Sequence, residues 1–240
     1  MLNFKKLFSI NIFAPEWRHI FLLLYWPVYG LTFWFLERGI TLDYAPIESP
    51  TDAMIPFCEY FIVPYLVWFA YLVWIHVHTF FADTKQFKKL MYFIMIVNTA
   101  AIITFIIYPS KQELRPTEFQ RDNIFVDMVK AFYVHDTNTN VLPSLHVTGS
   151  FAVLFASWRT KGLDTPLIRS INIVLTVLIS ISTVFLKQHS IIDVYAALVL
   201  CAIAWPVAYI LPDKIALLKS EKRPIEIKLN KKERVAVKKS

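Results

Sequence analysis

The sequence predicts an all-α membrane protein, a polytopic bundle of about six transmembrane helices. Hydrophobic residues make up 56% of the 240 positions, and the mean hydropathy is +0.48. A water-soluble domain of this length rarely reaches such values, because its surface must be polar. Five long apolar stretches contain no charged residue. The seven Trp and eleven Tyr suit the two membrane–water interfaces, where amphipathic rings are common.

A transmembrane helix needs about 20 predominantly apolar residues. The five uncharged stretches give the expected spans 20–36, 60–75, 90–108, 170–186 and 194–212. A sixth, shorter span is expected over 143–158, which carries His146 and would rise only about 24 Å as a helix. We include it because six spans give the connecting loops a consistent charge pattern.

Basic residues indicate the side of the membrane on which each connection lies, because cytoplasmic loops carry an excess of Lys and Arg. The N-terminal segment and the second and fourth connections are basic, and residues 213–240 alone hold ten Lys or Arg. We therefore expect both termini in the cytoplasm, a transmembrane domain over 1–212 and a basic, flexible cytoplasmic tail over 213–240. The acidic first connection and the third, about 109–141, then face outward. The first span is too long for a signal peptide and lacks a cleavage site.

The net charge of +7 does not indicate nucleic-acid binding, because the basic residues lie where they suit topology and anionic lipid headgroups. Cys58 and Cys201 lie in or beside apolar segments, so we interpret them as packing residues. No residue pattern indicates a metal site or a cofactor. The abundance of Lys, Ile and Phe suits a bacterial plasma membrane. No oligomeric state follows from the sequence.

Three polar patches lie near the predicted outer face. The first runs from Asn140 to Val147. Pro143 suits the first turn of a helix, and a helix that starts here directs free N–H groups and its positive dipole end outward, which makes an anion site. Ser144 adds a hydroxyl and His146 an imidazole. The alternative interpretation is a capped helix with an interfacial histidine.

The second patch runs from Ser182 to Asp193. His189 and Asp193 are four residues apart, so on a helix they share a face and can form a hydrogen bond. A carboxylate on one ring nitrogen fixes the tautomer and leaves the other nitrogen free as nucleophile or base. Lys187 supplies a cation nearby. Ionisable residues at a membrane span indicate a functional site, although an interfacial ion pair that holds a helix end is the alternative.

The third patch, residues 111–116, contains Lys111 and Arg115, whose guanidinium can give a planar fork to phosphate oxygens. Alone it is an ordinary charged loop. Together the three patches bring two His, a carboxylate, basic side chains, a Ser and a helix N-terminus to one membrane face. That combination suits attack on phosphorus with the negative charge held by donors.

At these residues the chain resembles the type-2 phosphatidic acid phosphatase superfamily, which has a Lys and Arg-Pro motif, a Pro-Ser-x-His motif and a Ser-Arg-x5-His-x3-Asp motif. The order and the membrane side match over about 111–197. The resemblance implies a helical bundle with metal-free chemistry at the outer face. It makes His189 the nucleophile that forms a phosphohistidine, Asp193 the residue that orients it, and His146 the general acid. It implies that Arg115, Ser144 and backbone N–H groups hold the phosphate oxygens. Ser182, which matches the third motif, and the nearby Lys111 and Lys187 are the further phosphate-binding candidates.

The chain also departs from the family pattern. Lys111 lies only four positions before Arg115, nearer than in the family. Thr183 stands where the third motif has Arg, and Thr cannot supply that charge, so we hypothesise that Lys187 replaces it. Pro-Ser-Leu-His with Lys-Gln-His is more similar to the inositol phosphorylceramide synthase branch, in which a lipid or alcohol hydroxyl resolves the phosphohistidine. Asp136 and Asn140 are carried over from that branch as supporting polar residues.

The leading prediction is an integral membrane phosphatase that hydrolyses a membrane lipid phosphate or diphosphate. Its expected partners are that substrate and the surrounding lipids. One alternative is a phosphotransferase that moves a phospho-headgroup to a lipid hydroxyl. The others are a transporter, because intramembrane charges also mark ion paths, and an inactive lipid-binding scaffold. The sequence leaves the substrate open among phosphatidate, phosphatidylglycerol phosphate, a polyprenyl diphosphate and an inositol phospholipid.

Overall fold

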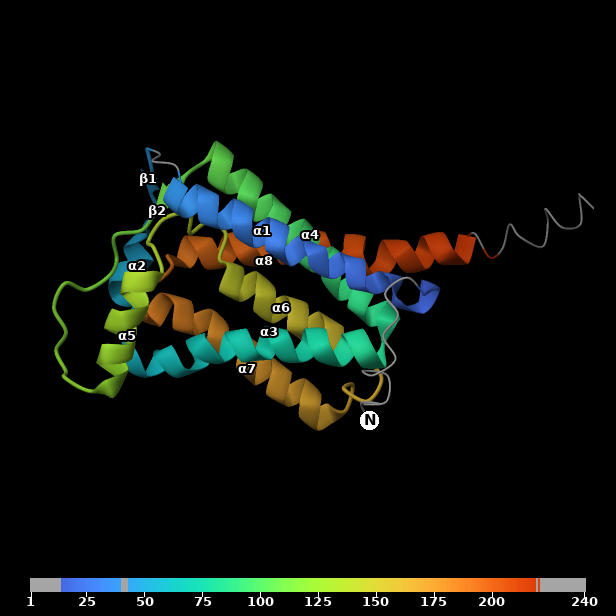
Figure 1. Cartoon of the computed structure of the whole chain (residues 1–240). Coiled ribbons are helices and arrows are strands. Elements are labelled where there is room, and N and C mark those ends of the chain that lie inside the picture. The colour runs from blue at the N-terminus through green and yellow to red at the C-terminus, as the bar shows by residue number, and fades with distance from the viewer. Residues whose placement is uncertain (1–13, 40–42, 219, 221–240) are drawn as a thin grey trace, which may run out of the picture.

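The computed structural model describes residues 14–39, 43–218 and 220, and it shows a bundle of long helices (Figure 1). Five apolar helices are long enough to cross a membrane: Trp17–Gly39, Glu59–Ala82, Thr84–Ile107, Pro166–Phe185 and Ile191–Leu218. Each uncharged stretch of the sequence falls on one of them. The strands of the described residues form one short parallel pair, β1 (Ala45–Pro46) with β2 (Ser110–Lys111). The all-α prediction is therefore confirmed.

Several of the long helices are composite. The first consists of the 3-10 helix η2 (Pro15–Leu24), α1 (Tyr25–Trp34) and the π-helix η3 (Phe35–Gly39). The others are η4 (Glu59–Phe61) with α3 (Ile62–Ala82), α4 (Thr84–Ile107), α7 (Pro166–Phe185), and α8 (Ile191–Trp205) with the π-helix η5 (Pro206–Ile210). Two short helices, α2 (Pro50–Met54) and α5 (Ile124–His135), lie in the connections. They gather with β1 and β2 at one end of the bundle (Figure 1), here called the loop end.

The sixth expected span is α6 (Leu145–Ser157), a helix of 13 residues. It packs against α3, α4, α7 and α8, and most of its side chains are buried. Small residues such as Gly149, Ala152 and Ala156 let the neighbouring helices approach closely. A helix that other helices surround does not need the length of a lipid-facing span. α6 lies within the bundle (Figure 1). His146, on its first turn, is buried there.

Gly149 lets Trp68 of α3 pack directly on α6. A Cβ atom at Gly149 would lie 2.8 Å from atoms of the Trp68 indole. Gly149→Ala is therefore expected to destabilise the protein by about 1–3 kcal/mol, the usual cost of overpacking, and to displace the indole. Thermal unfolding in detergent measures the effect against Gly30→Ala, because a Cβ at Gly30 meets nothing within 4 Å. Equal melting temperatures for the two variants would contradict this prediction.

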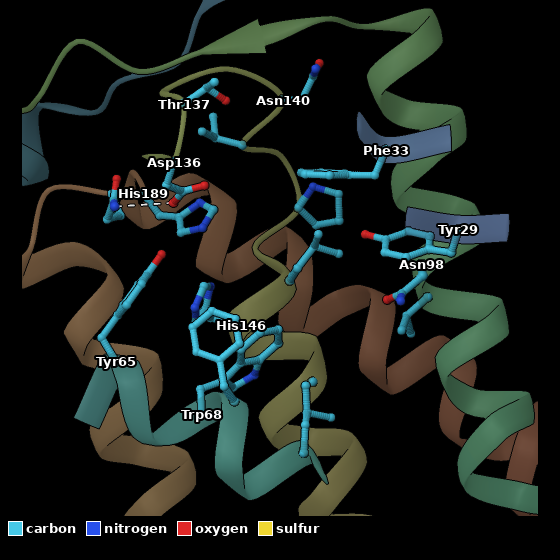
Figure 2. A pocket seen from close by; sticks show the side chains of 18 of the residues that line it. Tyr29, Phe33, Tyr65, Trp68, Asn98, Asp136, Thr137, Asn140, His146 and His189 are labelled. Carbon is cyan, nitrogen blue, oxygen red and sulfur yellow. Dashed lines mark hydrogen bonds between the residues drawn. The ribbon is translucent and has the colours of Figure 1, made fainter. Parts of the chain in front are cut away.

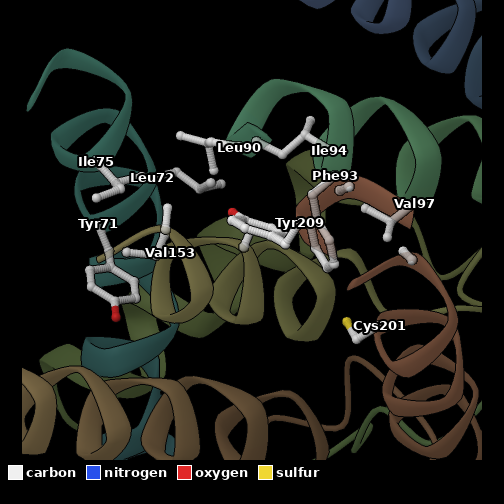
Figure 3. Packing of buried hydrophobic residues seen from close by; sticks show 14 of the residues in the cluster. Tyr71, Leu72, Ile75, Leu90, Phe93, Ile94, Val97, Val153, Cys201 and Tyr209 are labelled. Carbon is white, nitrogen blue, oxygen red and sulfur yellow. The ribbon is translucent and has the colours of Figure 1, made fainter. Parts of the chain in front are cut away.

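Buried apolar side chains of α3, α4, α6 and α8 form the main core (Figure 3). It includes Tyr71, Leu72, Phe93, Ile94, Val97, Val153 and Cys201. Cys201 is buried and unpaired, in agreement with its interpretation as a packing residue, whereas Cys58 is only partly buried. Large apolar side chains are exposed along the outer faces of the long helices, such as Leu31, Ile107 and Val199. Apolar surface of this extent suits contact with lipid, and the chain is an integral membrane protein.

The boundary predicted at residue 212 falls inside a helix that continues to Leu218. Lys89 of α4 anchors this extension, because its Nζ donates to the carbonyl of Tyr209 (3.2 Å) and binds Asp213 (2.5 Å). Lys85 binds the same carboxylate at 2.9 Å. The sequence showed these lysines only as basic loop residues. Residues 219 and 221–240 of the predicted tail lie outside the described residues, and the division into domains stays a prediction.

Candidate active site

His189 lies in the turn between α7 and α8, directly before the residue that caps α8. The Oδ2 atom of Asp193 accepts hydrogen bonds from Nδ1 of His189 (3.1 Å) and from the backbone N–H of Ser190 (3.0 Å). The predicted contact is present, but it arises from helix capping and not from a shared helix face. Ser190 and Asp193 form a capping box at the start of α8. The second ring nitrogen of His189, Nε2, does not contact this carboxylate.

The turn that carries His189 is held from both sides. The carbonyl of Thr183 accepts the backbone N–H groups of Gln188 and His189. Asp52, which reaches the turn from the first connection, accepts a hydrogen bond from Oγ of Ser190 (2.6 Å) and one from the N–H of Ile191 (2.8 Å). A carboxylate at this helix N-terminus is also favoured by the helix dipole. The position of His189 is therefore fixed by α7, α8 and Asp52 together.

His146 lies on the first turn of α6 and faces His189. Its ring stacks on Tyr65, with centroids 3.9 Å apart, and lies 4.2 Å from the ring of Trp68. The centroids of the two imidazole rings are 6.4 Å apart. Nε2 of His146 is buried and has no hydrogen-bond partner among the described residues. Figure 2 shows both rings at one side of the same cavity.

The N-termini of α6 and α8 converge beside the two histidines. The backbone N–H of Ser144, which precedes α6, donates to the carbonyl of Asp193 in α8 (3.2 Å). The hydroxyl of Ser144 is fully buried and finds no partner in the described part of the chain. Both helix ends direct positive partial charge toward this region. The helix N-terminus predicted at the first patch is thus present, because α6 begins at Leu145.

A cavity of about 250 Å³ extends from the histidines into the bundle. Its histidine end is polar, with Asp136, Gln188 and the side chains of the 137–140 loop. The rest of its wall is apolar and mostly aromatic, with Trp26, Tyr29, Phe33, Trp68, Phe69 and Leu72 (Figure 2). The wall is built by α1, α3, α4 and α6. The cavity therefore joins a polar end with two imidazoles to an apolar arm.

Arg115 lies behind Gln188, outside the residues that line the cavity. Its guanidinium donates to the carbonyls of Tyr133, Asp136 and Thr137 and to Oε1 of Gln188 (2.6 Å). Gln188 in turn donates to the carboxylate of Asp136 at 3.3 Å. Burial lowers the pKa of the Arg115 guanidinium, although Asp136 opposes this shift. In this arrangement Arg115 fixes the loop that forms the polar end of the cavity.

Four further predicted phosphate-binding residues are also absent from the cavity lining: Ser144, described above, and three others. Nζ of Lys187 donates to two backbone carbonyls of the 52–55 segment at 2.6 and 2.5 Å, and burial lowers the pKa of this ammonium group. Lys111 pairs with a neighbouring glutamate at the surface (2.6 Å). The hydroxyl of Ser182 donates to a carbonyl of its own helix. Their roles in phosphate binding, including the replacement of the motif Arg by Lys187, stay predictions.

Comparison with known families identifies the fold. A family model described as the PAP2 superfamily matches residues 89–216, more than half of the chain. The chain belongs to the PAP2 superfamily. The resemblance to type-2 phosphatidic acid phosphatases is therefore confirmed, and the chain has activity of the phosphatase or phosphotransferase type on a phosphate-bearing substrate. No curated protein and no solved structure matches the chain.

The PAP2 match runs from α4 to the C-terminal extension and contains every residue predicted for the site, His189, His146 and Asp193 among them. It does not reach α1, α2 or α3. Of these helices, α1 and α3 supply part of the aromatic wall, including Tyr29, Tyr65 and Trp68. The shape of the apolar arm therefore depends on chain outside the matched region.

Three residues that support the site were not found from the sequence: Gln188, Asp52 and Glu37. Glu37 ends the first long helix and accepts hydrogen bonds from Asn140 (2.5 Å), from Thr139 (3.1 Å) and from the hydroxyl of Thr137. It thereby ties the first helix to the loop above the cavity. Ser49 and Asp52 form a capping box, a pattern that indicates the start of α2, but no local signal predicts the contact of Asp52 with Ser190.

Proposed function

We propose that this protein is a membrane enzyme that removes the phosphate of a membrane lipid through a covalent phosphohistidine at His189. One observation carries the proposal: His189, oriented by Asp193, faces His146 across the polar end of a cavity whose other end is apolar. A lipid phosphate has the same two parts. Its phosphoryl group fits between the two imidazoles, and the adjoining part of the lipid fits the aromatic arm.

The reaction has two steps in this arrangement. Nε2 of His189 attacks phosphorus, and the bond from phosphorus to the lipid oxygen breaks while His146 gives that oxygen a proton. Water then attacks the phosphohistidine, His146 takes a proton from it, and the phosphorus–nitrogen bond breaks to release phosphate. Nδ1 of His189 donates a hydrogen bond to the carboxylate of Asp193. Nε2 therefore faces the substrate, and the carboxylate stabilises the positive charge that develops on the ring.

The N-terminus of α6 supplies the donors for the phosphate oxygens. Its free backbone N–H groups and the unpartnered hydroxyl of Ser144 suit an anion at this position. Arg115 does not line the cavity, but it donates a hydrogen bond to Gln188, which does. Its charge stabilises the phosphate from that distance and holds Gln188 at the cavity wall. Developing negative charge is therefore held by preorganised donors.

The distribution of basic residues supports an extracytoplasmic site. The loop end of the bundle carries the histidines, and the opposite end carries Lys85, Lys88, Arg159 and Lys161. By the positive-inside rule that opposite end and both termini are cytoplasmic. We place the protein in a bacterial plasma membrane, with its substrate in the outer leaflet.

Asp136 gives the reaction a pH dependence. Burial raises the pKa of this carboxyl, while His189 and Arg115 partly oppose the shift, so the pKa lies above the ordinary value of about 3.9. Above that pKa the carboxylate repels a bound phosphate, and below it the neutral acid does not. We expect KM to fall as the pH falls through the pKa, and Asp136→Asn to lower KM and flatten the profile. Steady-state kinetics across the acid range measure this.

The exposed Asp127 of α5 offers a control for this prediction. Its carboxylate lies 4.0 Å from Lys130 at the surface, so Asp127→Asn is expected to keep the wild-type KM profile. If Asp136→Asn also keeps that profile, the carboxyl of Asp136 does not face the phosphate.

Product analysis tests the proposed function. Purified protein in detergent receives lipids labelled in the phosphate, with and without an alcohol or ceramide-like acceptor, beside His189→Ala. We expect free phosphate that disappears in the variant. A new labelled lipid that forms only with acceptor would move the assignment to a phosphotransferase. Wild-type product levels in the variant would contradict a histidine-dependent reaction.

A further inference from the structure

Two buried hydrogen-bond donors lie in the apolar arm of the cavity. The hydroxyl of Tyr29 and the indole N–H of Trp68 have no partner among the described residues. The amide of Asn98 lines the same arm. Figure 2 shows Tyr29 and Asn98 on the side of the cavity opposite His189, with the hydroxyl of Tyr29 directed into it. The aromatic wall therefore contains neutral polar atoms from α1, α3 and α4.

These atoms define the kind of ligand that fits the arm. A buried donor without a partner is costly, so such groups in a native structure call for one. An indole N–H can only donate, and the partner must therefore be an acceptor. Of the described residues that line the cavity, Asp136 alone has a carboxyl group, and it lies at the histidine end. A neutral acceptor with little hydration fits the arm best, and in lipids that is a carbonyl oxygen.

The size of the cavity agrees with this ligand. A volume of about 250 Å³ is slightly below the roughly 300–1,000 Å³ of pockets that hold a drug-sized molecule. This is room for a phosphate and the few atoms that follow it, and the hydrocarbon chains must extend into the bilayer. In an acyl glycerol phosphate the ester carbonyls are among those few atoms. In a polyprenyl phosphate hydrocarbon takes their place.

We propose that Tyr29, Trp68 and Asn98, which line the same arm of the cavity, form a subsite for an acyl carbonyl, so that the enzyme selects acyl-ester lipid phosphates over ether-linked and polyprenyl phosphates. The inference rests on the proposed function, because the phosphate at His189 sets the position of the carbonyl. Tyr29 and Trp68 lie outside the part of the chain that matches the PAP2 model. The two unpartnered donors of the subsite thus belong to the N-terminal helices of this chain, whereas Asn98 lies in the matched region.

A comparison of ester and ether substrates tests the subsite. The full-length protein receives a diacyl glycerol phosphate, the dialkyl ether analogue with the same chains, and a polyprenyl phosphate. The ratio of kcat/KM for ester over ether is the readout, because losses of folding or catalysis that affect both substrates cancel in it. One neutral hydrogen bond corresponds to a preference of roughly fivefold. We expect at least this preference in the wild type, with the polyprenyl phosphate as poor as the ether.

Tyr29→Phe removes one donor and keeps the ring, so we expect it to reduce the ester preference severalfold. Trp68→Phe is a second variant with the same expected effect on the ratio. Tyr25→Phe is the matched control: Tyr25 stacks on Tyr29 from the same helix, but its hydroxyl is already bound to Met95 and Thr99. It is expected to keep the wild-type ratio. Equal rates for ester and ether in the wild type, or a full preference in both Tyr29→Phe and Trp68→Phe, would overturn the proposal.

Binding separates failure of the subsite from failure of the proposed function. If no lipid phosphate is turned over, the proposed function is wrong, and the affinities of non-hydrolysable phosphonate analogues with ester or ether chains still test the subsite. Tighter binding of the ester analogue, reduced in Tyr29→Phe and kept in Tyr25→Phe, supports it. Equal affinities overturn it.

Discussion

Replacing His189 with alanine is expected to lower phosphate release from a lipid phosphate by at least about 10⁴-fold, because no covalent intermediate forms without the imidazole. The turn around it should persist, since Asp193 still accepts from the N–H of Ser190 and Asp52 still binds Ser190 and Ile191. The loss should therefore appear in kcat. Steady-state assays of purified protein in detergent measure it.

His135→Ala is the matched control for this substitution. His135 ends α5 at the same loop end and is exposed. The contact described for its ring is with a carbonyl of its own helix. Turnover is expected to stay at the wild-type level. Thermal unfolding should give similar melting temperatures for both variants. Substantial turnover in a folded His189→Ala protein would show that another group attacks phosphorus.

His146→Gln is expected to lower turnover of a lipid phosphate by about 10²–10⁴-fold, the usual contribution of a general acid. The leaving group of a lipid phosphate is an alkoxide, which must receive a proton as it departs. An aryl phosphate leaves as a stable phenolate and has much less need of the acid. The loss in the first step should therefore be far smaller for the aryl substrate. The ratio kcat/KM, which reports formation of the phosphohistidine and not its hydrolysis, measures the difference for the two substrates in both proteins.

The aryl substrate also serves as the internal control. It must pass through the same phosphohistidine, so a variant that merely misplaces His189 loses turnover of both substrates equally. Equal losses would contradict the role of His146 as general acid and would leave it a residue that packs between Tyr65 and Trp68.

The features predicted correctly from the sequence depend on short-range patterns. The five long helices follow from uncharged apolar stretches, because lipid selects for such segments regardless of their partners. The contact of His189 with Asp193 follows from four positions of separation. The contact forms although His189 precedes the helix. In the capping box the carboxylate of Asp193 turns back toward the N-cap residue Ser190, and this places it next to His189.

The features that sequence reasoning did not find depend on partners far along the chain. A sequence shows which residues are charged, but it does not show which groups those residues bind. Lys187 binds carbonyls more than 130 positions away, and Arg115 binds the carbonyls of a loop and Gln188. Neither contact has a local signal. The sequence likewise shows Asp52 only as one acidic residue of an outer connection. In the structure its carboxylate accepts a hydrogen bond at the N-terminus of α8.

The residues of the cavity wall could not be predicted from the sequence for a related reason. Tyr29 and Trp68 are aromatic residues in apolar spans, where aromatic side chains are common. Only the packing of α3 against α6 and of α1 against α4 brings them to the cavity beside His146. The predicted end of the last span at 212 differed because Asp213 has buried Lys89 as a partner, so a charged residue does not end the helix.

Direct detection of the covalent intermediate tests the central claim. Protein is mixed with lipid labelled in the phosphate, quenched within one turnover in base, where phosphohistidine survives, and digested for mass spectrometry. The account predicts a phosphoryl group on His189, absent from His189→Ala and increased in His146→Gln supplied with an aryl phosphate, where removal of the intermediate is slowed. Label on a different residue, or turnover with no labelled protein at any time, would contradict it.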